Sequence, residues 1–215
     1  MPLIHKIYTA NQGIILLWEI VESIPQLLSL LPNPDYWEKE IENLGANSRK
    51  AEWLSTRILL YHYFPHQFPA IAYNEYGKPF LLNSSYSISI SHSKSLVAIF
   101  LNPHKKIAID LEIVHPRINK ITNKFLNETE YQFEFCEPDE LGQWTLLWSA
   151  KETMYKYYAQ KELAFKQIFI QASEKKMNTR NRGILSAMIN VEPIAICNVH
   201  YFRFGNCYLT YCIES

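Results

Sequence analysis

The 215-residue chain lacks an excess of charge of either sign. Lysine and arginine total 21, and aspartate and glutamate also total 21, so the formal net charge is zero. A general nucleic-acid binder usually has a strongly basic domain, and the balance therefore argues against one. A disordered chain is excluded as well, because 48% of the residues are hydrophobic and 14% are aromatic.

Cysteines and long apolar runs are also scarce. The four cysteines form no CxxC pair, which argues against a structural zinc site and predicts free thiols in a reducing compartment. The longest apolar run near the start is 13–18, far too short to span a membrane, and it has no basic leader or small-residue cleavage site. We therefore expect a cytoplasmic protein with no membrane partner.

Hydrophobic periodicity predicts an α+β fold. Apolar spacing indicates helices followed by strands, then helices, then strands again. This order predicts two halves that meet near residues 102–106. The expected helices are 22–31, two pieces within 36–64 separated at Gly45, 117–135 and 143–160; the expected strands are 11–20, 86–91, 96–101, 106–114, 166–172 and 199–213.

Two acidic residues share one face of the expected strand KIAIDLEIV (106–114). Alternation places Asp110 and Glu112 on the face opposite the isoleucines, about 7 Å apart along the strand. Carboxylates this close repel each other and lose hydration, and Mg²⁺ is well suited to offset both effects. The alternative is an ordinary solvent-facing side of a strand.

The segment LLWSAKETMYKYY (146–158) places three further side chains on one side of a helix. Glu152 and Lys156 are four residues apart, and Trp148 precedes Glu152 by four. Glu152 suits a third metal ligand or a general base, and Lys156 suits a phosphate contact. The alternatives are a surface Glu–Lys pair and a tryptophan that serves only core packing.

His92 and Lys78 are two further candidates for binding an anion. His92 ends the alternating strand SISISHS among small hydroxyl side chains, and Lys78 follows Gly77 in a tight turn. Either could instead be purely structural or solvated. Together with the acidic strand and the Glu–Lys helix, they suit a polyanionic substrate bridged by Mg²⁺, as in phosphoryl transfer. No GxxxxGKS or GxGxxG motif occurs, so a Walker-type NTPase and a dinucleotide enzyme are not indicated.

These motifs, in this order, resemble those of the 4′-phosphopantetheinyl transferases of the long, single-chain type that activates surfactin synthetase. The resemblance covers residues 49–166. Its carriers are EYGKPFL (75–81), ISISHS (88–93), IAIDLEIV (107–114), FLNETEY (125–131) and LLWSAKETMYKYY (146–158). It implies two similar α/β halves related by a pseudo-twofold, residues 1–104 and 105–215, with the active site between them.

The resemblance implies transfer of the phosphopantetheine arm of coenzyme A to a carrier-protein serine, with release of adenosine 3′,5′-bisphosphate. Mg²⁺, or Mn²⁺, would be held by Asp110, Glu112 and Glu152, with Glu130 a family acid near the metal. Glu152 would also be the base for the serine, and Lys156 would stabilise the leaving group. The positions expected to bind coenzyme A are Lys78, His92, Lys151, Lys156 and one of Arg49 and Arg57, between which the sequence does not choose.

The family prefers glycine where this chain has Ala108. The basic run after the acidic strand (Arg117, Lys120, Lys124) would steer an acidic carrier protein, or would be only a solvated helix face. Two other functions remain open, a metal-dependent nuclease or phosphodiesterase and a non-catalytic carrier-binding homologue. Because one chain contains both halves, we expect a monomer.

Overall fold

A computed structural model describes residues 3–131, 139–159, 163–172, 179, 181–192 and 194–214. Its first part contains β1 (Leu3–Tyr8), β2 (Ile14–Glu19), α1 (Ile24–Ser29), α2 (Pro34–Glu42), α3 (Asn47–Tyr63), β3 (Ile71–Tyr73), β4 (Pro79–Leu81), β5 (Ser87–Ser93) and β6 (Leu96–Asn102). The second part contains β7 (Ile107–Ile113), the 3₁₀ turn η1 (Pro116–Lys120), α4 (Thr122–Phe125), α5 (Glu128–Tyr131), α6 (Glu140–Tyr158), η2 (Phe165–Gln167), β8 (Ile168–Ala172), β9 (Arg182–Ile189), β10 (Ala195–Phe204) and β11 (Cys207–Ile213).

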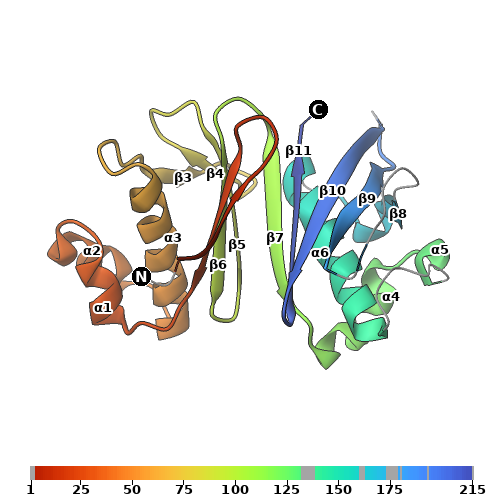
Figure 1. The fold of residues 1–215 in the computed structure, drawn as a ribbon, viewed down its shortest axis with the longest axis horizontal. Helices are drawn as coiled ribbons and strands as arrows, with labels where there is room; N and C mark the ends of the chain where they lie inside the picture. The colour runs from red at the N-terminus through yellow and green to blue at the C-terminus, as the bar shows by residue number, and fades with distance from the viewer. Residues whose placement is uncertain are drawn as a thin grey trace.

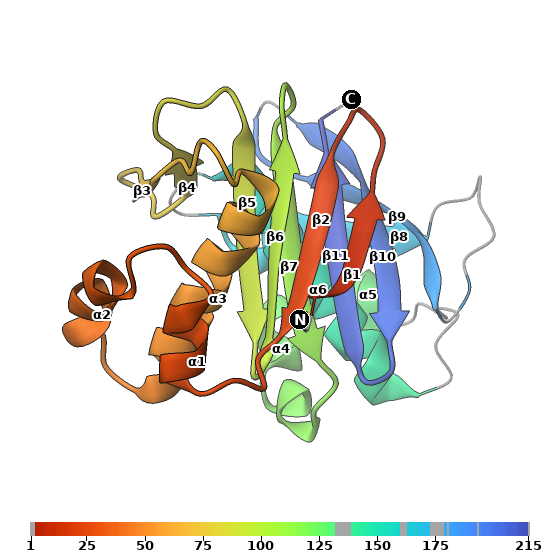
Figure 2. The ribbon, with the colours of Figure 1, turned by 60° about the vertical axis from the view of Figure 1, so that its left-hand side comes forward.

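The elements form four layers, with two sheets between two groups of helices (Figure 1). One sheet has the order β1-β2-β6-β5 and packs on α1, α2 and α3; the other has the order β7-β11-β10-β9-β8 and packs on α6. A third apolar cluster lies between the sheets and joins β2 and β6 to β7 and β11. Figure 2 shows the two sheets stacked one behind the other.

The α+β class is confirmed, and the chain passes from one sheet to the other between β6 and β7, near the expected junction. Apolar periodicity located α1, the α2–α3 pair with Gly45 between its members, α6, and the strands β2, β5, β6, β7, β8, β10 and β11. It missed β1, β9 and the short β3–β4 hairpin. The helix expected over 117–135 is three short pieces up to Tyr131, and 132–135 lie outside the described residues. The pseudo-twofold relation and the domain boundary stay predictions.

Serine side chains join the two sheets where β5 lies beside β7. The N–H groups of Ile109, Leu111 and Ile113 in β7 donate to the hydroxyls of Ser89, Ser91 and Ser93 at 3.0, 3.1 and 3.3 Å. β7 is an edge strand of its sheet, so these amides have no neighbouring strand carbonyls on that side. Both faces of β5 are thus buried. Ile88 packs under the helices on one face, and the serines of the other face contact β7.

Removing one of these hydroxyls should destabilise the fold. Ser89→Ala leaves the Ile109 N–H buried without its acceptor, so we expect the free energy of unfolding to fall by about 1–3 kcal/mol in urea titrations. Ser87→Ala is the matched control, because Ser87 lies on the same strand and makes no side-chain hydrogen bond within the described chain. An equal fall in unfolding free energy in the two variants would show that the hydrogen bonds between the β5 serines and the β7 amides do not stabilise the fold.

Candidate active site

Asp110 lies at the centre of the site, on the face of β7 that the sequence predicted. Ile107, Ile109 and Leu111 face the other sheet, and Ala108 packs into the core beneath α6. The methyl group of Ala108, where the family prefers glycine, therefore packs within the core. Asp110 itself is only 3% exposed, so its charge requires close partners.

Three side chains from two elements satisfy the Asp110 carboxylate. Lys156 of α6 donates to Oδ1 at 2.7 Å, and Ser91 of β5 donates to the same oxygen at 2.9 Å. Ser149 of α6 donates to Oδ2 at 2.9 Å. Lys156 also donates to Ser91 Oγ at 3.1 Å and to the Ile109 carbonyl at 3.2 Å, so its ammonium bridges β5 and β7. The helix α6 and the acidic strand β7 thus meet at Asp110.

A chain of buried hydroxyls holds Ser149 in turn. Ser149 Oγ lies 2.8 Å from Thr210 Oγ1, which lies 2.7 Å from Thr153 Oγ1. Thr210 is the residue of β11 paired with Asp110, and all three hydroxyl residues are buried. Because each group has a hydrogen-bond partner, this network fixes the orientation of Asp110 from both sheet and helix.

Glu112 and Glu152 are carboxylates with raised pKa values. Burial is the main cause for each, and the charge of Asp110 adds to it, so that each pKa rises to about 7. Trp148 Nε1 donates to Glu112 Oε1 at 2.9 Å, which partly opposes the rise. The three acids therefore share an electrostatic environment in which only Asp110 is paired with a cation.

Among the residues that the structure describes, no three histidine, cysteine or acidic side chains are grouped closely enough to hold a metal ion. The donor chemistry nevertheless fits a hard cation, because all three candidate ligands are carboxylates and two of them have pKa values raised by burial and by repulsion from Asp110. A divalent ion would relieve that repulsion, which the Lys156 ammonium offsets only in part.

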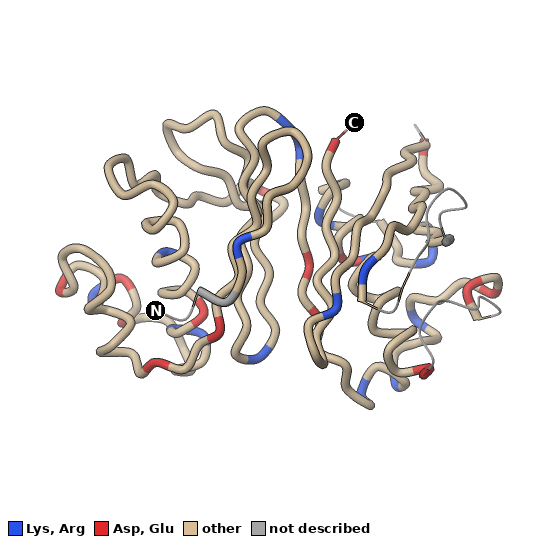
Figure 3. Tube along the Cα trace, viewed as in Figure 1, with Lys and Arg blue, Asp and Glu red and all other residues tan. Residues whose placement is uncertain are grey.

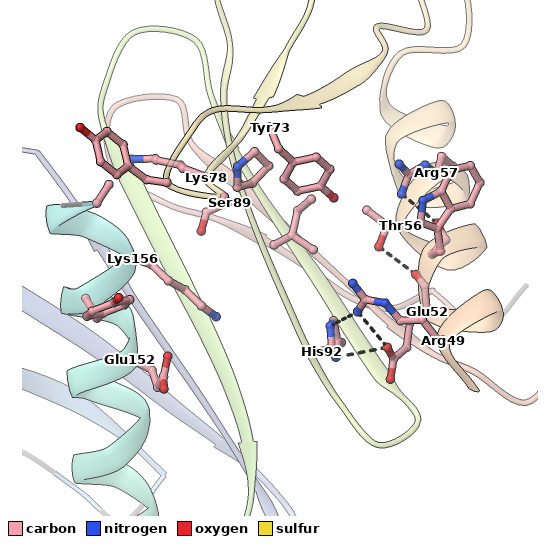
Figure 4. A pocket seen from close by; sticks show the side chains of 17 residues that line it. Arg49, Glu52, Thr56, Arg57, Tyr73, Lys78, Ser89, His92, Glu152 and Lys156 are labelled. Atoms are coloured by element: carbon pink, nitrogen blue, oxygen red, sulfur yellow. Dashed lines mark hydrogen bonds and ion pairs between the residues drawn. The ribbon is translucent and has the colours of Figure 1, made fainter. Parts of the chain in front are cut away.

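A cavity of about 330 Å³ opens beside these acids and is lined from both parts of the chain (Figure 4). It brings together most of the predicted coenzyme-binding side chains. From the first part come Arg49, Arg57, Lys78 and His92, and from the second come Glu152 and Lys156. Glu52, Trp53, Tyr73 and Tyr155 also line it and were not predicted.

The two arginines that the sequence could not separate lie in different surroundings. Arg49 is exposed and makes a 2.9 Å contact with His92, whereas Arg57 is 8% exposed and stacks on the Trp53 ring at 3.5 Å. Burial lowers the pKa of Arg57 to about 10, and that of Lys78 is also lowered, first by burial and then by Lys106. Both arginines line the cavity, so geometry alone does not reject either.

Lys151 is not among the residues that line the cavity. Its side chain is fully buried, with Nζ 2.7 Å from Glu130 Oε2, and it donates to the carbonyls of Phe125 and Phe165 at 2.6 and 3.2 Å. Glu130 accepts from the Ile170 N–H at 2.9 Å as well. These two predicted site residues therefore form an internal ion pair that ties the α4–α5 segment to α6 and β8.

The unpredicted residues had weak signals in the sequence. Ser91 has the same strand parity as Ser89, and Ser149 lies inside the WSAKE segment, but nothing indicated that their hydroxyls would meet Asp110. Glu52 follows Arg49 by three residues on α3, a spacing that allows an ion pair. Trp148 packs against the core, and its indole N–H also donates to Glu112, which the sequence did not indicate.

Comparison with known proteins gives a match over the segment that carries the acids. The sequence model of the 4′-phosphopantetheinyl transferase superfamily matches residues 106–198. This segment includes β7 and α6, which supply the three acids and Lys156. The match supports the resemblance to this superfamily over residues 106–198, whereas membership of the whole chain and the long, single-chain type stay predictions.

Particular relatives extend the match. The chain is 30% identical over 120 residues to the 4′-phosphopantetheinyl transferase AcpT of Escherichia coli O157:H7, which covers 54% of this chain and 61% of that protein. It is 29% identical over 113 residues to the AcpT of Salmonella typhi, covering 50% of this chain and 58% of that protein. The chain thus spans about three fifths of the length of the curated relatives it matches.

The raised pKa values predict a pH-dependent cost to stability. In the unfolded chain the carboxyls of Glu112 and Glu152 titrate near 4.5, and in the fold at about 7, so ionisation destabilises the fold as the pH rises through this window. Each of Glu112→Gln and Glu152→Gln should raise the unfolding free energy by about 1–3 kcal/mol at pH 8 in EDTA, and by little at pH 5. Urea titrations measure this, with exposed Glu75→Gln as control; a gain equal at both pH values would contradict it.

The buried ion pair predicts a structural role for Lys151. Lys151→Met leaves Glu130 buried without its cation, which should lower the unfolding free energy by about 3–5 kcal/mol. Exposed Lys166→Met provides the control for loss of a lysine nearby. Chemical denaturation is the measurement, and a Lys151→Met variant as stable as the parent would show that the pair contributes nothing.

Proposed function

We propose that this protein transfers the 4′-phosphopantetheine group of coenzyme A to a serine of a carrier protein and releases adenosine 3′,5′-bisphosphate. The observation that carries the proposal is the shared cavity, where arginines, Lys78 and His92 from the first part face Glu152 and Lys156 of the family-matched segment. Cationic and imidazole side chains suit the phosphates, and the carboxylate suits proton transfer.

Glu152 is the base in this proposal. Its pKa of about 7 suits a group that must accept a proton near neutral pH. The serine oxygen would form a bond to the phosphorus that bears the pantetheine arm while its proton passes to Glu152. The bond from that phosphorus to the bridging oxygen would break, and the electron pair would leave with the adenosine bisphosphate.

Lys156 would stabilise the charge that develops on the leaving group. Its ammonium lines the cavity and also contacts Asp110, so it lies at the border between the acids and the space for the phosphates. Lys78, His92 and the arginines would bind the nucleotide end, and Arg57, stacked on Trp53, would offer a fixed planar donor.

Mg²⁺ or Mn²⁺ would be held by Asp110, Glu112 and Glu152. When bound, the ion would neutralise the pyrophosphate and polarise the phosphorus under attack. Ser91, Ser149 and Thr210 would orient Asp110 for this purpose, as hydrogen-bond partners of metal ligands commonly do.

An acidic carrier protein would dock beside the acids, next to a second cavity of about 450 Å³. This cavity is lined by Glu112 and Trp148 at the site and by His115, Arg117 and Ile118 farther out. Exposed Lys120 and Lys124 follow on the same segment. The charges of the chain are otherwise interspersed, as Figure 3 shows, so this run is the surface that we assign to carrier steering.

One chain supplies both sides of the main cavity, which supports action as a monomer. In the part of the chain with described coordinates, no helix is both long and apolar enough to cross a membrane. The cytoplasmic location stays part of the proposal.

Transfer from a fluorescent coenzyme A analogue to purified carrier proteins, with Mg²⁺ and with EDTA, tests the proposal. Label should appear on carrier serine only with metal, and Glu152→Gln should lower kcat by about 100-fold or more. The Glu140→Gln variant, at the start of the same helix, should retain activity. Absence of label on every carrier with metal present would overturn the proposal, and cleavage of labelled DNA would favour a nuclease instead.

Charge reversal tests the docking surface. Lys120→Glu with Lys124→Glu should raise the KM for carrier about tenfold at low salt with kcat unchanged, because these lysines act by attraction. At 0.5 M salt the difference should nearly vanish, and Lys39→Glu on α2 should change neither constant. An unchanged KM at low salt would remove this surface from the proposal.

A further inference from the structure

One carboxylate lines the cavity in a place where only anion-binding groups would be expected. Glu52 of α3 lies between Arg49, one turn earlier on the same helix, and His92 of β5 (Figure 4). Glu52 Oε2 is 3.4 Å from Arg49 Nη1 and 3.4 Å from His92 Nδ1. Its side chain is 15% exposed, compared with 57% for Arg49. Glu52 therefore belongs to the wall of the cavity.

Arg49, Glu52 and His92 form a triangle of contacts. The contact between Arg49 and His92 determines the protonation state of the imidazole. Arg49 Nη1 lies 2.9 Å from His92 Nε2, and a guanidinium has donors only. His92 Nε2 must therefore accept, which makes the ring neutral and places its single N–H on Nδ1, facing Glu52. In the free protein, His92 thus has no N–H to offer to an anion through Nε2.

An entering phosphate group would compete for Arg49. The arginine is the most exposed member of the triangle, and a bidentate contact with phosphate is stronger than its contact with a neutral ring. Once Arg49 has turned to the phosphate, the lone pair of Nε2 is free. A proton taken from solvent at Nε2 would create a donor to the phosphate, while Nδ1–H still faces the Glu52 carboxylate.

We propose that Glu52 is the counter-ion through which His92 takes up a proton when a phosphate group enters the cavity and draws Arg49 from the ring. The inference rests on the proposed function in taking that phosphate to be one of those of coenzyme A. Glu52 is then a positioning residue: it touches the imidazole and the guanidinium, and the phosphate touches those two groups.

The charges around His92 agree with a neutral ring in the free protein. Burial lowers the pKa of His92 most, the Glu52 carboxylate raises it, Arg49 and Lys156 lower it, and Asp110 raises it. These groups come from α3, α6 and β7. A phosphate dianion beside Nε2 would add a further negative neighbour and raise the pKa of His92. The Glu52 carboxylate alone does not keep His92 protonated. The ring takes up a proton only when the phosphate adds its negative charge on the other side.

The effect of removing the Glu52 charge should therefore reverse with pH. Near pH 7 the wild type binds the phosphate through a protonated His92, which Glu52→Gln does not support, so the variant should bind more weakly. Near pH 9.5 the ring stays neutral even beside the phosphate, and the Glu52 carboxylate only repels the phosphate, so the variant should bind more tightly. The two curves of Kd against pH should cross, which a purely structural role of Glu52 would not produce.

Isothermal titration calorimetry in two buffers of different ionisation enthalpy measures both the Kd and the protons taken up. The ligands are adenosine 3′,5′-bisphosphate and, separately, inorganic phosphate. The wild type should take up about one proton per bisphosphate at pH 7.5, with Kd rising about tenfold per pH unit above pH 7. Glu52→Gln and His92→Gln should take up almost none, and Glu38→Gln, an exposed carboxylate on α2, should match the wild type.

Each outcome decides the matter. Loss of proton uptake in Glu52→Gln together with crossing curves supports the inference. Binding without uptake, uptake that persists in Glu52→Gln, or a Kd shifted by the same factor at every pH overturns it, and so does failure of both ligands to bind. Uptake with inorganic phosphate but no binding of the bisphosphate would uphold the role of Glu52 and count against coenzyme A as the substrate.

Discussion

The hydrogen bonds between the serine hydroxyls of β5 and the amides of β7 are the constraint on which the site depends. An edge strand with unpaired amides would ordinarily face solvent or another strand, and here three side chains take the place of strand carbonyls. Ser91 performs two tasks, since it accepts from Leu111 and donates to Asp110. The serine–amide contacts that join the sheets therefore also orient the Asp110 carboxylate. The cavity lies where the two parts of the chain meet.

Two carboxylates with raised pKa values distinguish this site from an ordinary buried ion pair. Asp110 is paired with Lys156 and with two serines, whereas Glu112 and Glu152 have protonation equilibria displaced toward neutral pH. By contrast, the Lys151–Glu130 pair is buried and its polar atoms contact backbone groups of several elements. Two adjacent residues of α6 thus differ in their surroundings, because Lys151 is buried in an ion pair and Glu152 lines the cavity.

Periodicity was sufficient to find the strands and helices that carry the site, because a strand buried on one face and a helix packed on a sheet both leave a regular apolar pattern. It found the face of β7 that bears Asp110 and Glu112, and helical spacing, the strand end and the Gly77 turn made Lys156, His92 and Lys78 candidates. It did not indicate that Lys151 is buried against Glu130, because burial depends on partners that come from other elements. Ser149, Thr210 and Glu52 escaped for the same reason, since their roles arise from contacts between separate elements.

Trp148 gives this arrangement an optical consequence. Its indole N–H is bonded to Glu112 Oε1, and its ring packs against Phe125 and Phe165. The emission of an indole responds to the charge and position of the acceptor on its nitrogen, so neutralising Glu112 or drawing it away changes the light that this residue emits. The chain therefore contains a native fluorophore that is hydrogen-bonded to Glu112. Through it, changes in the charge or position of that carboxylate can be followed without any label.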